Sequence, residues 1–408
     1  MEVLQEIKMD TYICDGLRTP FGRYGGSLKD IRADDLAAHV IKALVAKNPK
    51  ISDDLSEVIM GCANQAGEDN RNVARMALLL AGLPDTLPGI TLNRLCASGL
   101  EAIAYASRLI KCGDGQLVIA GGVEHMTRSP YVLGKSEQPY GRLQKLEDTT
   151  MGWRFINPKM KSMYGVDTMP ETAEKVAKEF NISREDQDKF SLLSQEKALK
   201  AIKSGVFKDE IIPVELPLKK KEKEPKIFSV DEHPRETSLE LLAKLKGVVT
   251  NDGVITAGNA SGINDGAVAT LIANEAMIKK YNLKPLARIK GAMASGVRPE
   301  VMGIGPIPAV KTLLNRYQLQ TKDIGIWELN EAFASQCLAV MRSLELPDDA
   351  SNVNIHGGAI AFGHPLGASG ARITFHAAKV LAESNERYAV ASMCVGVGQG
   401  SAILLEKV

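Results

Sequence analysis

The chain has 408 residues, of which 45% are hydrophobic and only 5% aromatic, so it is long enough for two or three domains with aliphatic cores. Fifty basic and forty-nine acidic residues leave a formal charge of +1, which provides no overall field for nucleic acid or for a membrane surface. An acidic ligand would therefore need a local group of cations.

The N-terminal sequence MEVLQEIKMD is neither a signal peptide nor an Arg-rich transit peptide. No apolar run in the sequence approaches the roughly 20 residues that span a bilayer. The six cysteines form no CxxC pair and no short disulfide-like spacing, which argues for a reducing compartment and against a zinc site. We therefore expect a cytoplasmic protein without nucleic-acid or membrane partners.

From residue 12 to residue 128 strand and helix patterns alternate, which is typical of a parallel sheet with crossover helices. Strands are predicted at 12–16, 56–62, 90–92 and 116–126, and helices at 33–48, 71–82 and 97–113. The last of these strands runs into glycines, as central strands do where another backbone or a ligand comes close.

Cys96 lies in the turn between the strand at 90–92 and the following helix. Free N–H groups and the positive end of the helix dipole favour a thiolate there, so Cys96 could act as a nucleophile near neutral pH. Free cysteines are also among the most buried residues, and most of them only fill space. The turn alone leaves both interpretations open.

Between residues 129 and 261 the alternation stops, which indicates a long insertion over a finished sheet. Helices are predicted at 171–180 and 184–205. The charge run at 219–226 mixes both signs and contains Pro225, so a solvated loop is favoured over a phosphate-binding patch.

After residue 261 a second series of strands and helices repeats the first. Strands are predicted at 266–274, 285–293, 324–329, 387–396 and 400–407, and helices at 309–317, from 332 onward, and at 368–384. Residues 330–339 match residues 93–102 at Asn, Ala, Ser and Ala, with Phe333 in the place of Cys96. The shared context of a strand followed by a helix favours a duplicated domain, with one cleft between its halves.

The second half contains partners for a nucleophilic thiolate. His364 lies just before a helix, and His356 lies in the same loop. A rigidly held histidine can pair with a thiolate or donate to a carbonyl oxygen, and the pattern does not decide between the two. Cys394 ends a strand among glycines, whose free N–H groups could bind an oxyanion.

Four ordered segments, NRLCASG, NEAF, GGAIAFGHPLGASGAR and CVGVGQG, resemble the signature segments of the thiolases, over essentially the whole chain. The resemblance implies an α/β protein with a duplicated αβαβα five-layer fold and an inserted loop domain. The expected domains are an N-terminal half at 1–128, completed by about 262–283, a loop domain at 129–261 and a C-terminal half at 284–408. The resemblance also implies ping-pong acyl transfer with coenzyme A (CoA) as a substrate. It implies no permanently bound cofactor and no metal, and a homodimer or homotetramer.

By this resemblance Cys96 is the nucleophile, which carries the acyl group as a thioester. His364 activates Cys96 and, with a water held by Asn330, stabilises the thioester enolate. Cys394 is the acid and base at the acetyl α-carbon. The backbone N–H groups of Cys96 and Gly396 bind the tetrahedral oxyanion.

Five residues correspond to the family's coenzyme A contacts. Ser261 and Ala257 match the pantetheine loop, and Met169 and Phe333 match apolar walls near the thioester. Arg235 matches a basic residue near the nucleotide.

Two positions depart from the family pattern. Val397 stands where glycine is common, and its side chain could tighten the cleft behind Gly396. His356 stands where asparagine is common, and we expect it to make a hydrogen bond within its loop rather than to act in catalysis.

The segment at 148–173 resembles the 3-oxoadipyl-CoA thiolases of aromatic degradation more than the acetoacetyl-CoA thiolases. A dicarboxylic substrate needs a cation for its distal carboxylate; Arg154, Lys159 and Lys161 are candidates, with solvated or interface charges as the alternative. The expected reaction is cleavage of 3-oxoadipyl-CoA with CoA to succinyl-CoA and acetyl-CoA. The alternatives are an acetyl-CoA acetyltransferase, a 3-ketoacyl-CoA thiolase of fatty-acid metabolism, a decarboxylating ketosynthase and a non-catalytic acyl-CoA or lipid carrier.

Overall fold

A computed structural model of the chain describes residues 9–136, 138–218, 220 and 223–408. The first eight residues lie outside the described part. So do residues 219, 221 and 222 of the charge run at 219–226, for which a solvated loop is expected.

Ten strands form the main sheet, in the order β12-β13-β14-β11-β1-β10-β5-β3-β4, with β2 beside β10. Their bounds are β1 Tyr12–Arg18, β2 Gly22–Arg23, β3 Glu57–Gly61, β4 Gly89–Leu92, β5 Leu117–His125, β10 Asn264–Ala273, β11 Ala287–Gly296, β12 Ile326–Leu329, β13 Tyr388–Val395 and β14 Gln399–Glu406. Each strand predicted from the sequence overlaps one of these strands.

The sheet consists of two halves, which β1 and β11 join through two residue pairs, Tyr12 with Arg288 and Ile13 with Ala287. Within this sheet β3 is parallel to β4 and β5, and β12 is parallel to β13. The remaining neighbours are antiparallel, so the predicted parallel arrangement is confirmed for β3 with β4 and β5 and for β12 with β13, and is wrong for the other pairs. β10 follows the long insertion and β14 follows β13 through a tight turn, so no crossover helix fixes the direction of either strand.

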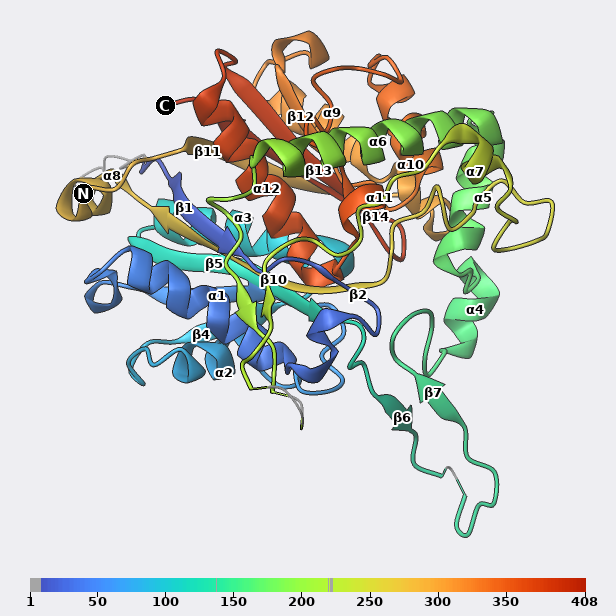
Figure 1. Cartoon of the computed structure of the whole chain (residues 1–408), viewed down its shortest axis with the longest axis horizontal. Coiled ribbons are helices and arrows are strands. Elements are labelled where there is room, and N and C mark those ends of the chain that lie inside the picture. The colour runs from blue at the N-terminus through green and yellow to red at the C-terminus, as the bar shows by residue number, and fades with distance from the viewer. Residues whose placement is uncertain (1–8, 137, 219, 221–222) are drawn as a thin grey trace, which may run out of the picture.

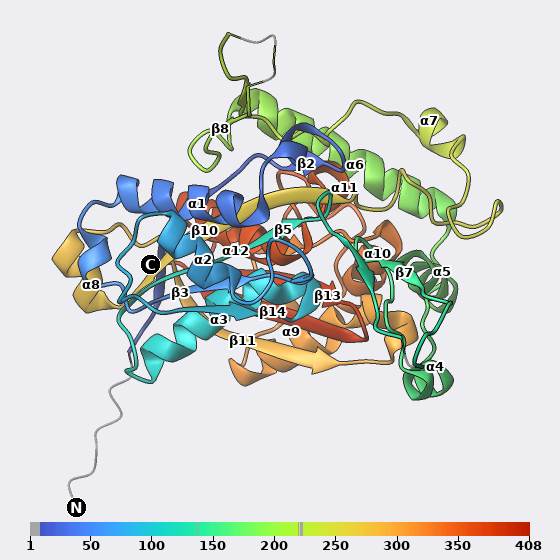
Figure 2. The ribbon, with the colours of Figure 1, turned by 90° about the horizontal axis from the view of Figure 1, so that it is seen from below.

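Helices separate the two half-sheets and cover their outer faces (Figures 1 and 2). α3 and α12 lie between the half-sheets and contact strands of both. α1 and α2 cover the N-terminal half, and α9 and α10 cover the C-terminal half. Their bounds are α1 Ala33–Lys47, α2 Val73–Leu80, α3 Ser98–Lys111, α9 Pro306–Arg316, α10 Ala334–Ser343 and α12 Leu366–Glu383. Three apolar cores fill the spaces between these layers, so the predicted five-layer αβαβα fold is confirmed.

The insertion between β5 and β10 contains short strands and both predicted helices. Its elements are β6 Tyr131–Leu133, β7 Leu146–Asp148, α4 Pro158–Tyr164, α5 Met169–Glu179, α6 Arg184–Ser204, β8 Val214–Glu215, β9 Ile227–Phe228 and α7 Leu239–Ala243. The capping box at Ser183 begins α6, and Gly205, in the left-handed conformation, ends it. α6 packs on α10 and on α11 (Ala359–Phe362), whereas β6 and β7 extend away from the body of the molecule (Figure 1).

α8 (Glu275–Tyr281) connects β10, in the N-terminal half of the sheet, to β11, in the C-terminal half. The domain boundaries drawn at 128, 261 and 283 stay predictions. Among the described residues, none of the helices combines the length and the apolar character that a membrane crossing requires.

Candidate active site

The turn that holds Cys96 is fixed by hydrogen bonds on both sides. Leu95 has a φ of 44°, which is uncommon for a residue with a branched side chain, and its N–H donates to Asn93 Oδ1 at 2.8 Å. The Ser98 hydroxyl donates to the Leu95 carbonyl oxygen at 2.6 Å and accepts the Arg94 N–H at 2.9 Å. Cys96 follows in a single 3₁₀ turn that leads into α3, so its position is set by a rigid local structure.

The protonation state of Cys96 differs from the sequence-based expectation. The pKa of its thiol is raised to about 11, mainly by burial and to a smaller extent by the charge of Glu124. The backbone N–H groups of Gly396 and of Cys96 itself face the sulfur and lower the pKa, but by less. The prediction of a thiolate near neutral pH is therefore wrong for the free protein, because desolvation outweighs the N–H groups.

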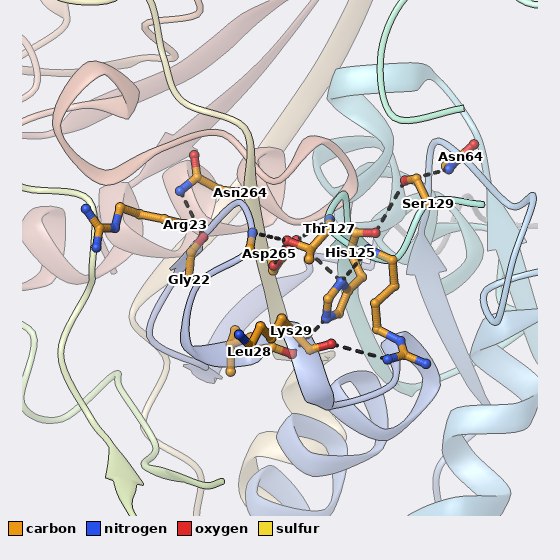
Figure 3. Close-up of polar contacts among 12 residues, drawn as sticks. Gly22, Arg23, Leu28, Lys29, Asn64, His125, Thr127, Ser129, Asn264 and Asp265 are labelled. Atoms are coloured by element: carbon orange, nitrogen blue, oxygen red, sulfur yellow. Dashed lines mark hydrogen bonds and ion pairs between the residues drawn. The ribbon is translucent and has the colours of Figure 1, made fainter. Parts of the chain in front are cut away.

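His364 precedes α12 and is held through its backbone. Its N–H donates to Asn264 Oδ1 at 3.1 Å, and Asn264 Nδ2 donates to the Gly22 carbonyl oxygen at 2.9 Å (Figure 3). The adjacent Gly363 has a φ of 91°, and a Cβ at that position would collide with the Asn264 amide. β10 and the β2 loop of the N-terminal half therefore set the place of this histidine.

The ring of His364 is held in one tautomer. The Ser369 hydroxyl donates to the Pro365 carbonyl oxygen at 2.9 Å, so it accepts from His364 Nδ1, 2.6 Å away. This assignment leaves Nε2 as an acceptor, 3.4 Å from Asn330 Nδ2. Burial, and then the charge of Arg372, lower the pKa of His364 to about 4, so the imidazole is neutral near pH 7 and can accept a proton.

Asn330 follows β12, at the position that corresponds to Asn93 in the first half. Its N–H donates to the Ser392 carbonyl oxygen at 3.0 Å, which ties it to β13. Its Oδ1 is buried and has no protein partner among the described residues. A water or a substrate group bound there would satisfy this oxygen.

Cys394 lies near the end of β13, and its thiol donates to Gln336 Oε1 at 3.4 Å. Burial raises its pKa far above the usual range, and the neighbouring Cys96 raises it further, so the two sulfurs lie within electrostatic range of each other. Gly396 follows two residues later and directs its N–H at the Cys96 sulfur. The structure therefore brings Cys96, Cys394 and Gly396 together from two distant segments.

Val397 has a strained backbone. It is 39% exposed, and its φ of 62° places it in the left-handed region, which costs a β-branched residue more than glycine. The expectation that its side chain tightens the cleft behind Gly396 stays a prediction.

His356 makes a hydrogen bond, but its partner lies on α12 rather than in its own loop as expected. Its Nδ1 lies 3.0 Å from His376 Nε2, and His376 Nδ1 lies 3.2 Å from Glu210 Oε2. Burial, and then the neighbouring His376, lower the pKa of His356 to about 4. Among the two histidines that the sequence left open, His364 contacts Asn330 while His356 pairs with a buried histidine of α12.

Three of the five predicted CoA contacts, Met169, Phe333 and Ser261, lie in or beside the apolar cluster that contains Cys394. Met169 and Phe333 belong to one apolar cluster with Cys394, and Ala260 packs against that cluster. The Ser261 N–H donates to the Ala332 carbonyl oxygen at 2.9 Å, beside Phe333. Ala257 lies in the same loop as Ser261, four residues earlier.

Arg235 is exposed at the outer end of this loop. It donates to the Ala257 carbonyl oxygen at 3.3 Å and faces His233 Nε2 at the same distance. Partial burial and the charge of Arg23 lower its pKa, so two arginines lie near each other here. A pair of neighbouring cations is suited to a phosphate group.

Three supporting residues were not singled out from the sequence: Asn264, Ser369 and Gln336. Asn264 and Ser369 lie inside two glycine-containing segments, GNASGINDGA and GASG. No sequence pattern identifies the partner of a buried amide or hydroxyl, however. Gln336 follows NEAF by three residues. The one sequence feature that could have identified it is its polar side chain on a helix that covers a sheet.

The chain resembles known proteins over its whole length. The family models for the thiolase N-terminal and C-terminal domains match residues 11–276 and 283–407. The beta-ketoadipyl-CoA thiolase of Pseudomonas knackmussii is 57% identical over 98% of this chain and 99% of its own. The 3-oxoadipyl-CoA/3-oxo-5,6-dehydrosuberyl-CoA thiolase of Escherichia coli K12 is 55% identical over 98% of this chain and 100% of its own.

Solved structures agree with this similarity. The human mitochondrial 3-ketoacyl-CoA thiolase in complex with CoA superposes with a TM-score of 0.89 and 41% identity, over 98% of this chain and 99% of that one. The Bacillus anthracis acetyl-CoA acetyltransferase superposes with a TM-score of 0.91 and 38% identity, over 99% of this chain and 100% of that one.

Proposed function

Because this chain belongs to the thiolase family of acyltransferases, we propose that it cleaves 3-oxoadipyl-CoA with CoA to succinyl-CoA and acetyl-CoA. The chemistry is supported by the Gly396 N–H that faces the Cys96 sulfur, by the electrostatic effect of Cys96 on Cys394, and by the Asn330–His364 contact. β13, which carries Cys394, and α12, which follows His364, both pack on the turn that holds Cys96. The observation that carries the substrate is the 55 to 58% identity to thiolases named for this compound.

In the first half-reaction the Cys96 sulfur attacks the 3-oxo carbon of the substrate. His364 Nε2 takes the thiol proton as the bond forms, since its other nitrogen already donates to Ser369. The carbonyl oxygen becomes an alkoxide, to which the N–H groups of Cys96 and Gly396 donate.

The alkoxide then collapses to a succinyl thioester on Cys96. The bond between C2 and C3 breaks, and its electron pair passes to C2 as the enolate of acetyl-CoA. Cys394 protonates C2, while protonated His364 and a water on Asn330 stabilise the enolate oxygen. In the second half-reaction the Cys394 thiolate takes the proton of the CoA thiol, and the CoA sulfur attacks the thioester. Protonated His364 returns its proton to the leaving Cys96 sulfur, which releases succinyl-CoA and restores the Cys96 thiol.

The protonation states predict an unusual alkylation profile. Between pH 7 and 10 the rate at which iodoacetamide alkylates Cys96 is expected to rise about tenfold per pH unit, since the pKa of the thiol is about 11. Intact-mass spectrometry on a Cys112→Ala background follows the reaction, because Cys112 is exposed and would also react. A plateau above pH 7 would show a preformed thiolate and contradict this prediction.

A comparison of three substrates tests the proposed substrate class. Turnover of 3-oxoadipyl-CoA should exceed that of acetoacetyl-CoA and of a medium-chain 3-oxoacyl-CoA. A preference for either monoacid would favour the acetyltransferase or the fatty-acid thiolase alternative and end the dicarboxylate proposal.

We propose Arg154 as the cation for the distal carboxylate. It is half-buried, its NH2 group donates to Asn64 Oδ1 at 2.8 Å, and it makes no ion pair among the described residues. Lys159 and Lys161 are exposed on α4, a helix without buried residues. A half-buried cation with only neutral partners is suited to an incoming carboxylate, whereas exposed lysines gain little from one.

Arg154→Gln is expected to lower kcat/KM for 3-oxoadipyl-CoA by about 10- to 100-fold, because a charge-assisted contact is lost. The value for acetoacetyl-CoA should stay within about twofold. Lys161→Gln is the matched control and should change neither. An equal loss for both substrates in Arg154→Gln would mean that Arg154 supports the fold of the loop rather than the carboxylate.

The assembly and the location belong to the same proposal. A homodimer or homotetramer is supported by exposed apolar side chains on α2, on α3 beside the edge strand β4 and on the β6–β7 hairpin: Leu79, Leu80, Tyr105, Tyr131 and Leu133. Sedimentation velocity tests it, and a monomer at micromolar concentration would refute it. All six cysteines are free, which supports a cytoplasmic location.

A further inference from the structure

Glu124 is a buried carboxylate in β5 that binds three backbone N–H groups. Oε2 accepts from Ala63 at 2.9 Å and from Gly367 at 2.8 Å, and Oε1 accepts from Asn64 at 3.1 Å. The side chain is almost completely buried, with 1% of its surface exposed. A carboxylate in such surroundings persists because its lone pairs are occupied by donors.

Two of these donors belong to the loop that supports the Cys96 turn. The Ala63 carbonyl oxygen accepts from Asn93 Nδ2 at 2.9 Å, and Asn93 Oδ1 accepts the Leu95 N–H. Asn64 is tied on its other side to Ser129 Oγ at 2.9 Å (Figure 3). A shift of this loop would therefore move the residues on either side of Cys96.

The third donor belongs to the segment that carries His364. Gly367 is in the first turn of α12, three residues after His364. A carboxylate at this end of the helix is also stabilised by the helix dipole. Glu124 therefore bonds to the supports of both the proposed nucleophile and its proposed base.

The backbones of the two halves lie so close together here that the glycines at the contact leave no room for side chains of their own. A Cβ at Gly99 would lie 2.5 Å from the Gly367 carbonyl oxygen, and one at Gly122 would overlap the same oxygen. A Cβ at Gly367 would lie 2.5 Å from the Val123 carbonyl oxygen. Where these backbones meet, the Glu124 carboxylate links the two halves, because it accepts from the Ala63 N–H of one half and from the Gly367 N–H of the other.

An acidic neighbour and two cysteines interact electrostatically with Glu124. Asp69 raises the pKa of Glu124, and burial is the larger cause that brings it to about 7. Glu124 in turn raises the pKa of Cys62 and of Cys96. Its charge therefore acts on the Cys96 thiol directly as well as through the loop.

We propose that Glu124 is a positioning residue of the reaction proposed above: it joins the loop beneath Cys96 to the first turn of α12, and so fixes Cys96 relative to His364. The proposal rests on the proposed thiolase function. Glu124, a side chain outside the reacting groups, then aligns one half of the molecule with the other.

Glu124→Gln tests both effects of this carboxylate. An amide keeps one oxygen for Ala63 and Gly367 but turns an NH2 group toward the Asn64 N–H, so the alignment is lost. The expected kcat falls about 100-fold while KM for CoA stays within about twofold. Alkylation of Cys96 by iodoacetamide at pH 8 should become about threefold faster, since a negative charge near the thiol is removed.

Two variants complete the experiment. Glu328→Gln removes another almost completely buried carboxylate, which lies in β12 rather than in β5, and should leave the alkylation profile unchanged. Glu124→Asp keeps the charge but shortens the side chain, so kcat should fall without faster alkylation. If Glu124→Gln fails to fold, the kcat and the alkylation rate of Glu124→Asp still test the proposal.

Wild-type kcat in Glu124→Asp, or unchanged kcat and alkylation in Glu124→Gln, would overturn the proposal. Failure of the proposed function has a different signature, since the wild-type protein would then form no acyl thioester on Cys96 from succinyl-CoA.

Discussion

Replacing Cys96 with alanine is expected to abolish cleavage of 3-oxoadipyl-CoA, with kcat reduced by at least about 10⁴-fold. The loss is large because the sulfur makes the covalent intermediate itself. His364 and the N–H group of Gly396 would remain, but they act on an oxyanion that no longer forms. The remaining rate would come from binding and from attack by water.

Intact-mass spectrometry checks this prediction at the level of the intermediate. The wild-type protein incubated with succinyl-CoA should gain the mass of one succinyl group, located on Cys96 by peptide mapping, and Cys96→Ala should gain none. Cys112→Ala is the control, since Cys112 is an exposed cysteine at the end of α3. Acylation that persists in Cys96→Ala would place the nucleophile elsewhere.

Replacing Cys394 with alanine should separate the two half-reactions. Acyl transfer from succinyl-CoA to Cys96 needs His364 but no acid at C2, so the acyl-enzyme should still form. Cleavage of the carbon–carbon bond needs a proton at C2, and it should slow by about 10³-fold.

Two measurements read these steps independently: acyl-enzyme formation by mass, and exchange of the acetyl-CoA methyl protons with deuterium by NMR. Exchange should disappear in Cys394→Ala. Cys337→Ala is a matched control, since Cys337 is a buried cysteine near Cys394 whose thiol donates to the Asn330 carbonyl oxygen and accepts from Gln336 Nε2. Deuterium exchange that survives in Cys394→Ala would assign the acid and base to another group.

The local structure of this chain could be read from its sequence because short-range rules fix it. The helix at 184–205 is an example: Ser183 and Gly205 supply its first and last signals, and the observed helix spans Arg184–Ser204. Strand direction could not be read in the same way. β1 pairs with β10 and β11, which lie more than 240 residues later, and no local pattern records such a pairing.

The composition of the candidate site was also predictable, while its electrostatics were not. Turn residues and glycines marked the neighbourhoods of Cys96, His364 and Cys394. The raised pKa of Cys96 and the lowered pKa of His364 depend on burial by segments far away in the chain. The choice between His356 and His364 likewise depended on partners, His376 and Asn330, that only the fold brings near.

The place of β1 has a consequence for synthesis on the ribosome. The first strand of the chain is paired on one side by β10, the last strand of its own half-sheet to be translated, and on the other by β11, the first strand of the second half-sheet. β3, β4 and β5 can associate early, but β1 has neither neighbour until residue 264 and beyond have left the exit tunnel. Apolar residues such as Ile13 and Leu17 must therefore stay shielded from other nascent chains over most of translation, and chaperone demand should peak before β10 emerges.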